Sequence, residues 1–415
     1  MVLLMVASAV GLAVRWVKVP YSIALVIVGL AMGASHLLPH VAMTPELILL
    51  IFLPALLFEA SWNLDVKELL HDWRAIFLLA VPGVLLAMAV GAGVMHLLGA
   101  LSWPMALLFG AMTAATDPIS VLALFRKLGV DHRLTLILEA ESLFNDGTAV
   151  VLFKLVLAVA MASAAAVAAG SAVVVDYSPT GVAFDFVFSV LGGSVVGLAV
   201  GFISSYVTRF FDDHLLEITI TTIAAYGSYL LADQFNVSAV IAVLMAGIVV
   251  GNYGSRQHMS TTTRLAVDAF WEYAAFLVNS LVFLLIGLQI DLPLLAKYSV
   301  QIGAGIVAIL VARLLIVYIF GFIIASKDRP LPMPWKHMLF WGALRGSLSM
   351  ALALSLPLSF DQREEMIVIT FGVVLFTLLV PGLTIEPLAR LLKLSGIDGN
   401  KIMPAAVEHE TEIRA

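Results

Sequence analysis

Residues 141–153 read ESLFNDGTAVVLF and place Asn145 and the ionisable side chain of Asp146 inside a largely apolar stretch, residues 133–163. About 20 such residues are enough for an α-helix to cross a bilayer, so the stretch predicts a transmembrane helix. A charged side chain is costly at this depth and marks either a functional group or a paired one. The segment therefore indicates both the environment of the chain and its most informative residue.

The composition extends this environment to the whole chain. Of its 415 residues, 62% are hydrophobic and only 12% are charged, and the mean hydropathy is +1.06. Lipid offers the backbone no hydrogen-bond partner, and the apolar runs have the length of helices rather than of barrel strands. We therefore expect an all-α integral membrane protein. The absence of cysteine excludes disulfides and thiolate metal ligands, and no basic run suggests a nucleic-acid partner.

Charges, prolines and glycines divide the apolar sequence into helix-length segments. They predict thirteen transmembrane spans, at about 1–14, 19–38, 43–62, 74–99, 102–125, 133–163, 185–209, 214–233, 237–253, 267–290, 298–325, 336–357 and 366–391. The first of these, MVLLMVASAVGLAV, has neither a basic leader nor a clear cleavage site, so we expect it to be retained.

Lysine and arginine are distributed unevenly among the predicted loops, and cytoplasmic loops usually carry their excess. Seventeen of the 22 basic residues fall in odd-numbered loops or in the tail, whereas only Lys297 and Arg363 fall in even-numbered loops. The alternation supports thirteen spans. It predicts that the N-terminus is outside and that the short tail, residues 392–415, is cytoplasmic. We expect the protein to lie in a plasma membrane, of the bacterial inner-membrane type.

Two spans are interrupted at corresponding positions. The fifth contains Thr116-Asp117-Pro118, and the twelfth contains Gly342 and Gly346. Proline removes a backbone donor and glycine weakens a helix, so both spans are expected to break near mid-membrane and to turn dipole ends and free carbonyls toward an ion. An odd span between two blocks of six gives the blocks opposite orientations, the inverted-repeat plan of many secondary transporters.

Residue spacing along 133–163 separates its carboxylates. Ser142 and Asp146, four residues apart, share one helix face, whereas Glu141 and Asp146 diverge. We expect Asp146 to face a cavity and Glu141 to pair with a cation on another helix. Arg345 is the predicted partner because guanidinium binds a carboxylate in a bidentate manner, whereas Arg313 is interpreted as a structural or interfacial residue.

Four motifs resemble those of the monovalent cation:proton antiporters of the NhaP/NHE (sodium/proton exchanger) branch. They occur in the order found in that family and together are far more specific than the Asn-Asp pair alone. The motifs are FLPALLFEA (52–60), TAATDPISVLALF (113–125), ESLFNDG (141–147) and WGALRGSLSMALALSLP (341–357).

The resemblance implies site roles. Asp146 would bind the cation and the proton in turn, Ser142 and Thr116 would supply oxygens, and Glu59 would act directly or through water, so that these four are the expected Na⁺ ligands. Asn145 stands where the electrogenic branch has its first Asp, which favours one-for-one, electroneutral exchange. Glu141 and Arg345 would hold two spans together, and Asp117 would complement the half-helix ends at the crossing.

The resemblance also implies an architecture within residues 1–391. A core domain, roughly 74–165 and 267–357, would slide as an elevator against a dimerisation domain formed by the remainder, and the protein would be a homodimer in lipid that needs no cofactor. It is expected to be a transporter and not an enzyme.

General physics agrees with such exchange, because a lone carboxylate holds either a proton or a small hard cation, and because moving it empty and charged through the membrane is prohibitive. Na⁺ or Li⁺ is the expected substrate, K⁺ the main alternative. An organic-ion symporter and an intramembrane aspartyl protease using Asp117 and Asp146 are weaker alternatives. The residues alone leave two roles open: Asp117 could cap a half-helix or contact the ion, and the hydroxyls of Thr116 and Ser142 could bond their own helix carbonyls.

Overall fold

The structure, a computed structural model, describes residues 2–14, 16, 20–34, 44–168, 179–210, 212–255, 259–324, 331–360 and 362–394. Within these residues the chain is almost entirely helical and contains no strand. The predicted tail beyond Leu394, and the basic loop residues Arg15, Lys18, Arg256, Lys327 and Arg329, lie outside the described residues.

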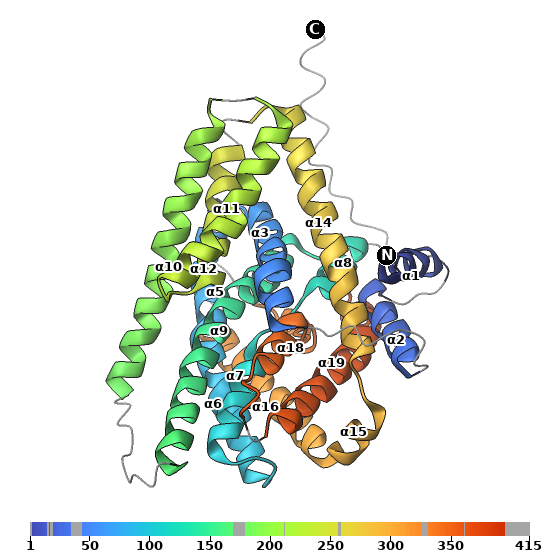
Figure 1. Cartoon of the computed structure of the whole chain (residues 1–415). Helices are drawn as coiled ribbons and strands as arrows, with labels where there is room; N and C mark the ends of the chain where they lie inside the picture. The colour runs from blue at the N-terminus through green and yellow to red at the C-terminus, as the bar shows by residue number, and fades with distance from the viewer. Residues whose placement is uncertain are drawn as a thin grey trace.

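The helices follow one another through short connections (Figure 1). In the first half they are α1 (Val2–Ala13), α2 (Tyr21–Ala34), the π-helix η1 (Leu47–Phe52), α3 (Leu53–Asn63), α4 (Val66–His71), α5 (Trp73–Ala80), α6 (Pro82–Leu97), α7 (Trp103–Ala114), α8 (Ile119–Leu128) and α9 (His132–Ala168). In the second half they are α10 (Pro179–Thr208), α11 (His214–Gln234), α12 (Ala239–Val249), η2 (Val250–Gly254), α14 (Thr261–Leu288), α15 (Leu292–Lys297), α16 (Ser299–Ile324), α17 (Met333–Trp341), α18 (Ser347–Leu354) and α19 (Arg363–Leu391).

These helices confirm the predicted all-α membrane fold. Eight helical segments among the described residues are long and apolar enough to cross a membrane, and four shorter apolar ones join them. The interrupted pair α17 and α18 corresponds to the twelfth predicted segment, 336–357. Both predicted interruptions are present, one between α7 and α8 and one between α17 and α18.

Local sequence explains where many helices begin. Pro82 occupies the first turn of α6, where its missing N–H costs nothing, and so separates α6 from α5. Asp213 accepts hydrogen bonds from the backbone N–H groups at the start of α11, and Ser260 does the same for α14. These caps satisfy N–H groups that have no partner within the helix.

The helices pack in two groups. In one group α14 packs against α1, α2, α3 and α11, and α12 packs against α3, α10 and α11. In the other, α5, α6, α7, α9 and α16 pack on one another, and α19 packs on α16, α17 and α18. The expected division placed 267–290 with the core helices and 366–391 with the remainder. It concerns which parts of the protein move together and stays a prediction, although α14 packs mainly on helices of the expected remainder.

The tightest crossing in the first group is between α2 and α14. Gly29 and Gly287 lie at the crossing, and a Cβ on either would collide with backbone atoms of the opposite helix. Small residues at such a crossing let two backbones approach within membrane-spanning bundles. This contact explains why α14 belongs with α2 although the two are far apart in sequence.

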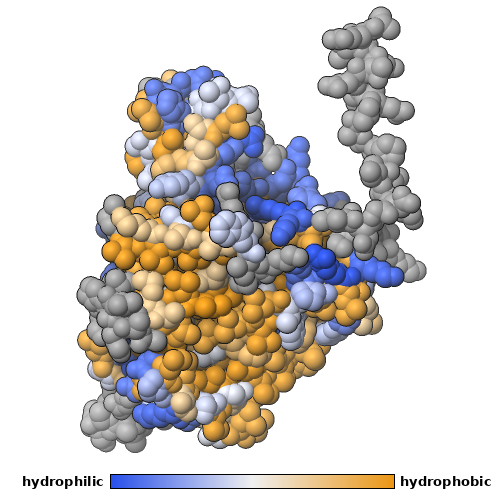
Figure 2. Space-filling model, turned by 90° about the vertical axis from the view of Figure 1, so that its right-hand side faces the viewer, coloured by the Kyte–Doolittle hydropathy of each residue, from blue (hydrophilic) through white to orange (hydrophobic). Residues whose placement is uncertain are grey.

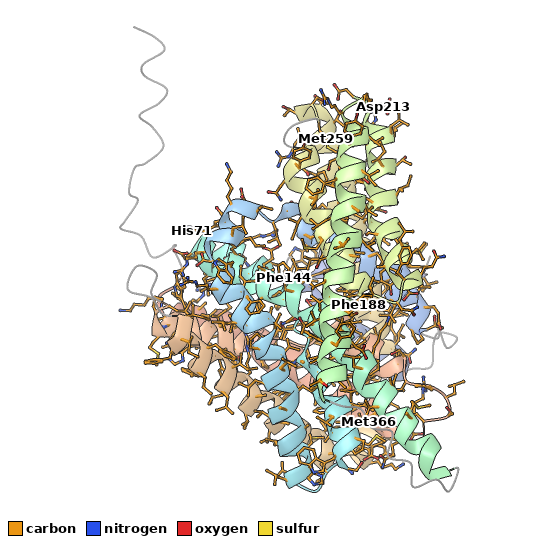
Figure 3. All side chains as sticks on the ribbon, turned by 90° about the vertical axis from the view of Figure 1, so that its left-hand side faces the viewer. His71, Phe144, Phe188, Asp213, Met259 and Met366 are labelled. Atoms are coloured by element: carbon orange, nitrogen blue, oxygen red, sulfur yellow. The ribbon has the colours of Figure 1, made fainter. Side chains whose placement is uncertain are left out.

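The loops lie at two opposite ends of the molecule. The uneven distribution of Lys and Arg predicts that these two ends face opposite sides of the membrane. Figure 3 shows Asp213 and Met259 at one end and Met366 at the other, with Phe144 about midway between them. The two basic residues at the end with Met366 have local partners: Lys297 pairs with Glu364 at 3.7 Å, and Arg363 donates to the carbonyls of Leu354 and Leu356 at the end of α18. Figure 2 shows a broad apolar surface below a band of hydrophilic residues, as expected of a protein in lipid.

Candidate functional site

The two helix breaks meet at the centre of the molecule. Residues 115–118 separate α7 from α8, and residues 342–346 separate α17 from α18. The backbone N–H of Asp117 donates to the carbonyl of Leu344 at 2.8 Å, so the two breaks are hydrogen-bonded to each other. Pro118 disfavours a helical conformation at the residue before it and lacks a donor of its own, which accounts for the first break.

Asp117 lies between the N-termini of both half-helices. Its Oδ1 accepts from the backbone N–H of Ile119 at 3.1 Å, and the N–H of Ser347, the first residue of α18, also bonds to this carboxylate. Gly346 packs so closely against the Asp117 side chain that a Cβ at residue 346 would overlap it. Because both helix N-termini carry partial positive charge, the geometry makes Asp117 a shared cap.

The first break is held against α9 by three hydrogen bonds. The side-chain amide of Asn145 donates to Thr116 Oγ1 at 2.7 Å, and its oxygen accepts from the Thr116 N–H at 3.3 Å. The hydroxyl of Ser142 donates to the carbonyl of Thr116. The Ser142 hydroxyl therefore donates to the broken helix and not to a carbonyl of its own helix. The lone pairs of its oxygen remain available to accept a bond.

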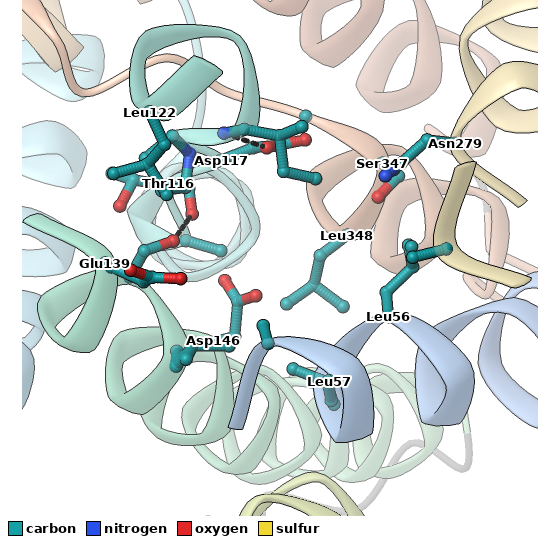
Figure 4. A pocket seen from close by; sticks show the side chains of 18 of the residues that line it. Leu56, Leu57, Thr116, Asp117, Leu122, Glu139, Asp146, Asn279, Ser347 and Leu348 are labelled. Atoms are coloured by element: carbon teal, nitrogen blue, oxygen red, sulfur yellow. Dashed lines mark hydrogen bonds between the residues drawn. The ribbon is translucent and has the colours of Figure 1, made fainter. Parts of the chain in front are cut away.

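Asp146 differs from every polar neighbour on α9. Its Oδ1 is buried and has no hydrogen-bond partner among the described residues. The residue lines a cavity of about 240 Å³, and Figure 4 shows its carboxylate directed into the space bounded by Thr116, Asp117 and Leu348. A buried carboxylate without a donor must be neutralised by a proton or a cation, or be solvated in the cavity.

The same cavity collects the other residues expected at the site. Glu59 from α3, Thr116 and Asp117 from the first break and Ser142 from α9 all line it. At its edge Arg126 pairs with Glu139 at 3.8 Å. Carboxylate, hydroxyl and carbonyl oxygens are the ligands that hard monovalent and divalent cations accept. No cluster of three or more His, Asp or Glu side chains suited to a metal ion occurs within the described ranges.

Two lining residues were missed by the sequence reasoning. Ser349 of α18 is buried, and its hydroxyl has no partner among the described residues. Asn279 of α14 also lines the cavity. The signal was there for both, because Ser349 belongs to the motif at 341–357 and Asn279 interrupts the apolar run AAFLVNSLVFLL.

The predicted pairing of Glu141 with Arg345 is wrong. Glu141 instead forms a buried, bidentate ion pair with Arg313 of α16, in which Arg313 Nη2 lies 3.0 Å from Glu141 Oε2. Arg313 also donates twice to the carbonyl of Leu339 at the end of α17, at 2.8 and 3.0 Å. A single guanidinium thus joins α9, α16 and α17.

Arg345 occupies a different position. Its backbone N–H donates to Thr377 Oγ1 at 3.0 Å. Its side chain is buried, with Nε and Nη1 unbonded among the described residues, and it is close enough to interact electrostatically with Glu141, Asp146 and Arg313. The guanidinium therefore supplies a positive charge near the cavity without a direct bond to either carboxylate.

Comparison with known proteins gives a consistent family. A family profile described as "Sodium/hydrogen exchanger, transmembrane" matches residues 1–391. The chain is 44% identical to the Na⁺/H⁺ antiporter ApNhaP of Aphanothece halophytica over 385 residues, 91% of this chain and 71% of that protein. It is 38% identical to the Na⁺/H⁺ antiporter NhaH of Halobacillus aidingensis, covering 95% of this chain and 97% of that protein.

The fold has a solved counterpart. The structure of the sodium proton antiporter MjNhaP1 from Methanocaldococcus jannaschii at pH 8 superposes with a TM-score of 0.76 and covers 95% of this chain and 97% of that one. The sequence identity between the two is 21%. The likeness therefore extends over nearly the whole arrangement of helices.

Proposed function

The chain belongs to the sodium/hydrogen exchanger family, and on this premise we propose that it is a Na⁺/H⁺ antiporter of the NhaP type in which one Na⁺ and one proton compete for Asp146. It is a transporter by family and fold, and the exchange is electroneutral. Na⁺ or Li⁺ is the transported cation, and K⁺ is the alternative substrate for the same site.

The observation that carries this proposal is the unpartnered Asp146 carboxylate. Asp146 Oδ1 is buried without a donor among the described residues, and the side chain opens into a cavity. A proton or a cation can each neutralise the carboxylate, but not both at once. The empty charged site is costly to move through a low-dielectric region, so only loaded carriers cross, and competition becomes exchange.

The surrounding oxygens suit a dehydrated cation. Ser142 keeps lone pairs after donating to Thr116, and Glu59 lines the same cavity. We propose Asp146, Ser142, Thr116 and Glu59 as the Na⁺ ligands, Glu59 directly or through water. Hydroxyl and carboxylate oxygens replace the hydration shell of such a hard cation.

Electroneutrality is supported by Asn145. The side-chain amide of Asn145 is engaged by Thr116 through both its nitrogen and its oxygen, and an amide cannot carry the second proton that a carboxylate there would release. One titrating carboxylate at this point of α9 fits one proton for one Na⁺.

Alternating access requires the two sides of the cavity to move relative to each other. The cavity lies between α3 and α14 of one packing group and α8, α9 and α18 on the other side. We propose that these two sides slide in an elevator motion within a homodimer in the plasma membrane, with the N-terminus outside and the tail in the cytoplasm. If the moving parts follow the packing groups, we propose that the boundary between them lies between α14 and α16.

Proteoliposomes containing a pH-sensitive dye test the proposal directly. Adding NaCl to the wild type should move protons at a rate that does not change when the membrane potential is clamped, and Asp146→Asn should reduce the rate to that of protein-free vesicles. Flux that follows the clamped potential contradicts electroneutrality, and undiminished flux in Asp146→Asn rules out Asp146 as the site. Flux with KCl alone changes the substrate to K⁺.

A further inference from the structure

A second cavity, of about 440 Å³, lies on the other side of α8 from the Asp146 cavity. Ile119, Ala123 and Asn279 line both cavities, so the first turns of α8 form part of the wall between them. Across this second cavity the hydroxyls of Ser22 and Ser120 are hydrogen-bonded, which joins α2 to α8. The site is therefore separate from the proposed ion path and bounded by α2, α8, α14 and α19.

Its interior is largely apolar, and the hydroxyls of Tyr21, Ser22 and Ser120 that line it already have hydrogen-bond partners. Phe276 and Phe283 of α14 and Leu124 of α8 belong to its apolar wall. Tyr21 stacks on Phe276 with ring centroids 5.4 Å apart, and its hydroxyl bonds Ser280 at 2.8 Å. An occupant of this interior needs an apolar body and no additional hydrogen-bonding groups.

The mouth of the second cavity carries a net positive charge. Lys127 and Arg390 both line the cavity and are exposed. Arg390 pairs with Glu386 at 2.7 Å, whereas Lys127 forms no ion pair with any described residue. The neighbouring Arg126 is directed to Glu139 at the first cavity. Among the described residues, one uncompensated positive charge therefore lies at the mouth.

An apolar interior with one excess positive charge at its mouth is complementary to a membrane phospholipid whose head group carries one net negative charge. A zwitterionic head group brings its own cation to the mouth and gains nothing from Lys127. Basic pockets between transmembrane helices commonly hold anionic head groups, since the lipid phosphate is at the depth of the helix ends.

We propose that this cavity binds one anionic phospholipid, with its phosphate at Lys127 and Arg390 and an acyl chain along Phe276 and Phe283. The cavity walls come from α2 and α14 of one packing group and from α8 and α19 of the other side. A lipid bound there contacts both sides at once and so stabilises the arrangement seen in this structure over others.

The test measures thermal stability of the purified full chain in a zwitterionic detergent, titrated with phosphatidylglycerol, phosphatidylcholine or inorganic phosphate. Phosphatidylglycerol should raise the unfolding midpoint of the wild type more than phosphatidylcholine does, because a ligand that binds only the folded state stabilises it. Phosphate alone should have no effect.

Three variants test whether the positive charge at the mouth governs the affinity for phosphatidylglycerol. Lys127→Gln should weaken the apparent affinity for phosphatidylglycerol about fivefold, and Glu386→Gln, which adds net positive charge, should strengthen it. Lys67→Gln removes another exposed lysine, on α4 and away from this cavity, and should leave the affinity unchanged.

An equal response to the two lipids in the wild type, or an undiminished response in Lys127→Gln, overturns the proposal. If inorganic phosphate alone raises the unfolding midpoint, the ligand is a soluble anion and the proposal of a bound lipid is wrong. Because this assay requires no transport, its failure is distinguishable from failure of the proposed exchange.

Discussion

Glu141 and Asp146 lie five residues apart on α9, but the surroundings of their carboxylates differ. Both oxygens of Glu141 are bonded by Arg313, and its side chain is only 1% exposed. Asp146 Oδ1 has no donor among the described residues and faces a cavity. A carboxylate with a dedicated guanidinium holds helices together, whereas one without a partner must take its counter-ion from solution.

Removing one carboxylate at a time should separate these roles by stability. Glu141→Gln leaves Arg313 buried and uncompensated and should destabilise the protein by about 3–5 kcal/mol. Asp146→Asn removes a half-buried carboxylate whose buried Oδ1 has no partner among the described residues, and should leave stability unchanged or raise it. The unfolding midpoint of each purified variant in detergent measures the difference.

The double variant Glu141→Gln/Arg313→Gln is the control, because it removes both charges and should recover part of the loss. An equal loss in Asp146→Asn and Glu141→Gln would mean that Asp146 is also a structural carboxylate. If the double variant recovers none of the lost stability, the main contribution of Arg313 to stability would be its two bonds to the Leu339 carbonyl.

The shared cap at Asp117 predicts a smaller effect. Gly346→Ala puts a Cβ where the Asp117 side chain now lies, so the two breaks must separate, at a cost of about 1–3 kcal/mol and with slower exchange. Gly93→Ala is the matched control, since nothing lies within 4 Å of its added Cβ. Unfolding midpoints and dye-based exchange rates check both variants. Equal midpoints and rates in Gly346→Ala and Gly93→Ala would show that the Asp117 side chain moves aside without loss of stability.

Two hydroxyls on α9 separate a proposed Na⁺ ligand from a group that only bonds its own helix. Ser142→Ala removes the bond to the Thr116 carbonyl and a proposed Na⁺ ligand, so the apparent KM for Na⁺ should rise severalfold, as for the loss of about 1 kcal/mol. Thr148→Ala removes a hydroxyl that bonds only the Phe144 carbonyl of its own helix, at 3.0 Å, and should leave KM unchanged. Initial exchange rates against Na⁺ concentration supply both values, and a matching rise in Thr148→Ala would assign the effect to helix packing.

The sequence predicted the features that depend on short spacing. Composition indicates the membrane, Pro118 indicates the first break, and the four-residue interval places Ser142 on the face of Asp146. The helices and both breaks confirm these expectations. The structure also brings Glu59, Thr116, Ser142 and Asp146 to one cavity, although their roles in binding stay predictions.

What the sequence could not supply were distances between helices. Arg313 and Arg345 are equally plausible partners for Glu141 by chemistry, and only the packing of α16 beside α5, α6 and α19 brings Arg313 to it. For the same reason the division into a core domain and a dimerisation domain stays a prediction. The crossing of α14 with α2 depends on Gly29 and Gly287, which are separated by most of the chain.

The most direct test of the central claim is the dependence of the Na⁺ KM on pH, with the transmembrane potential held at zero. If Na⁺ and the proton compete for Asp146, lowering the pH raises the apparent KM for Na⁺ by up to about tenfold for each pH unit and leaves the maximal rate unchanged, because saturating Na⁺ displaces the proton. A KM that stays constant while the maximal rate changes with pH would show that the proton and Na⁺ bind at different groups, and would contradict a single shared carboxylate.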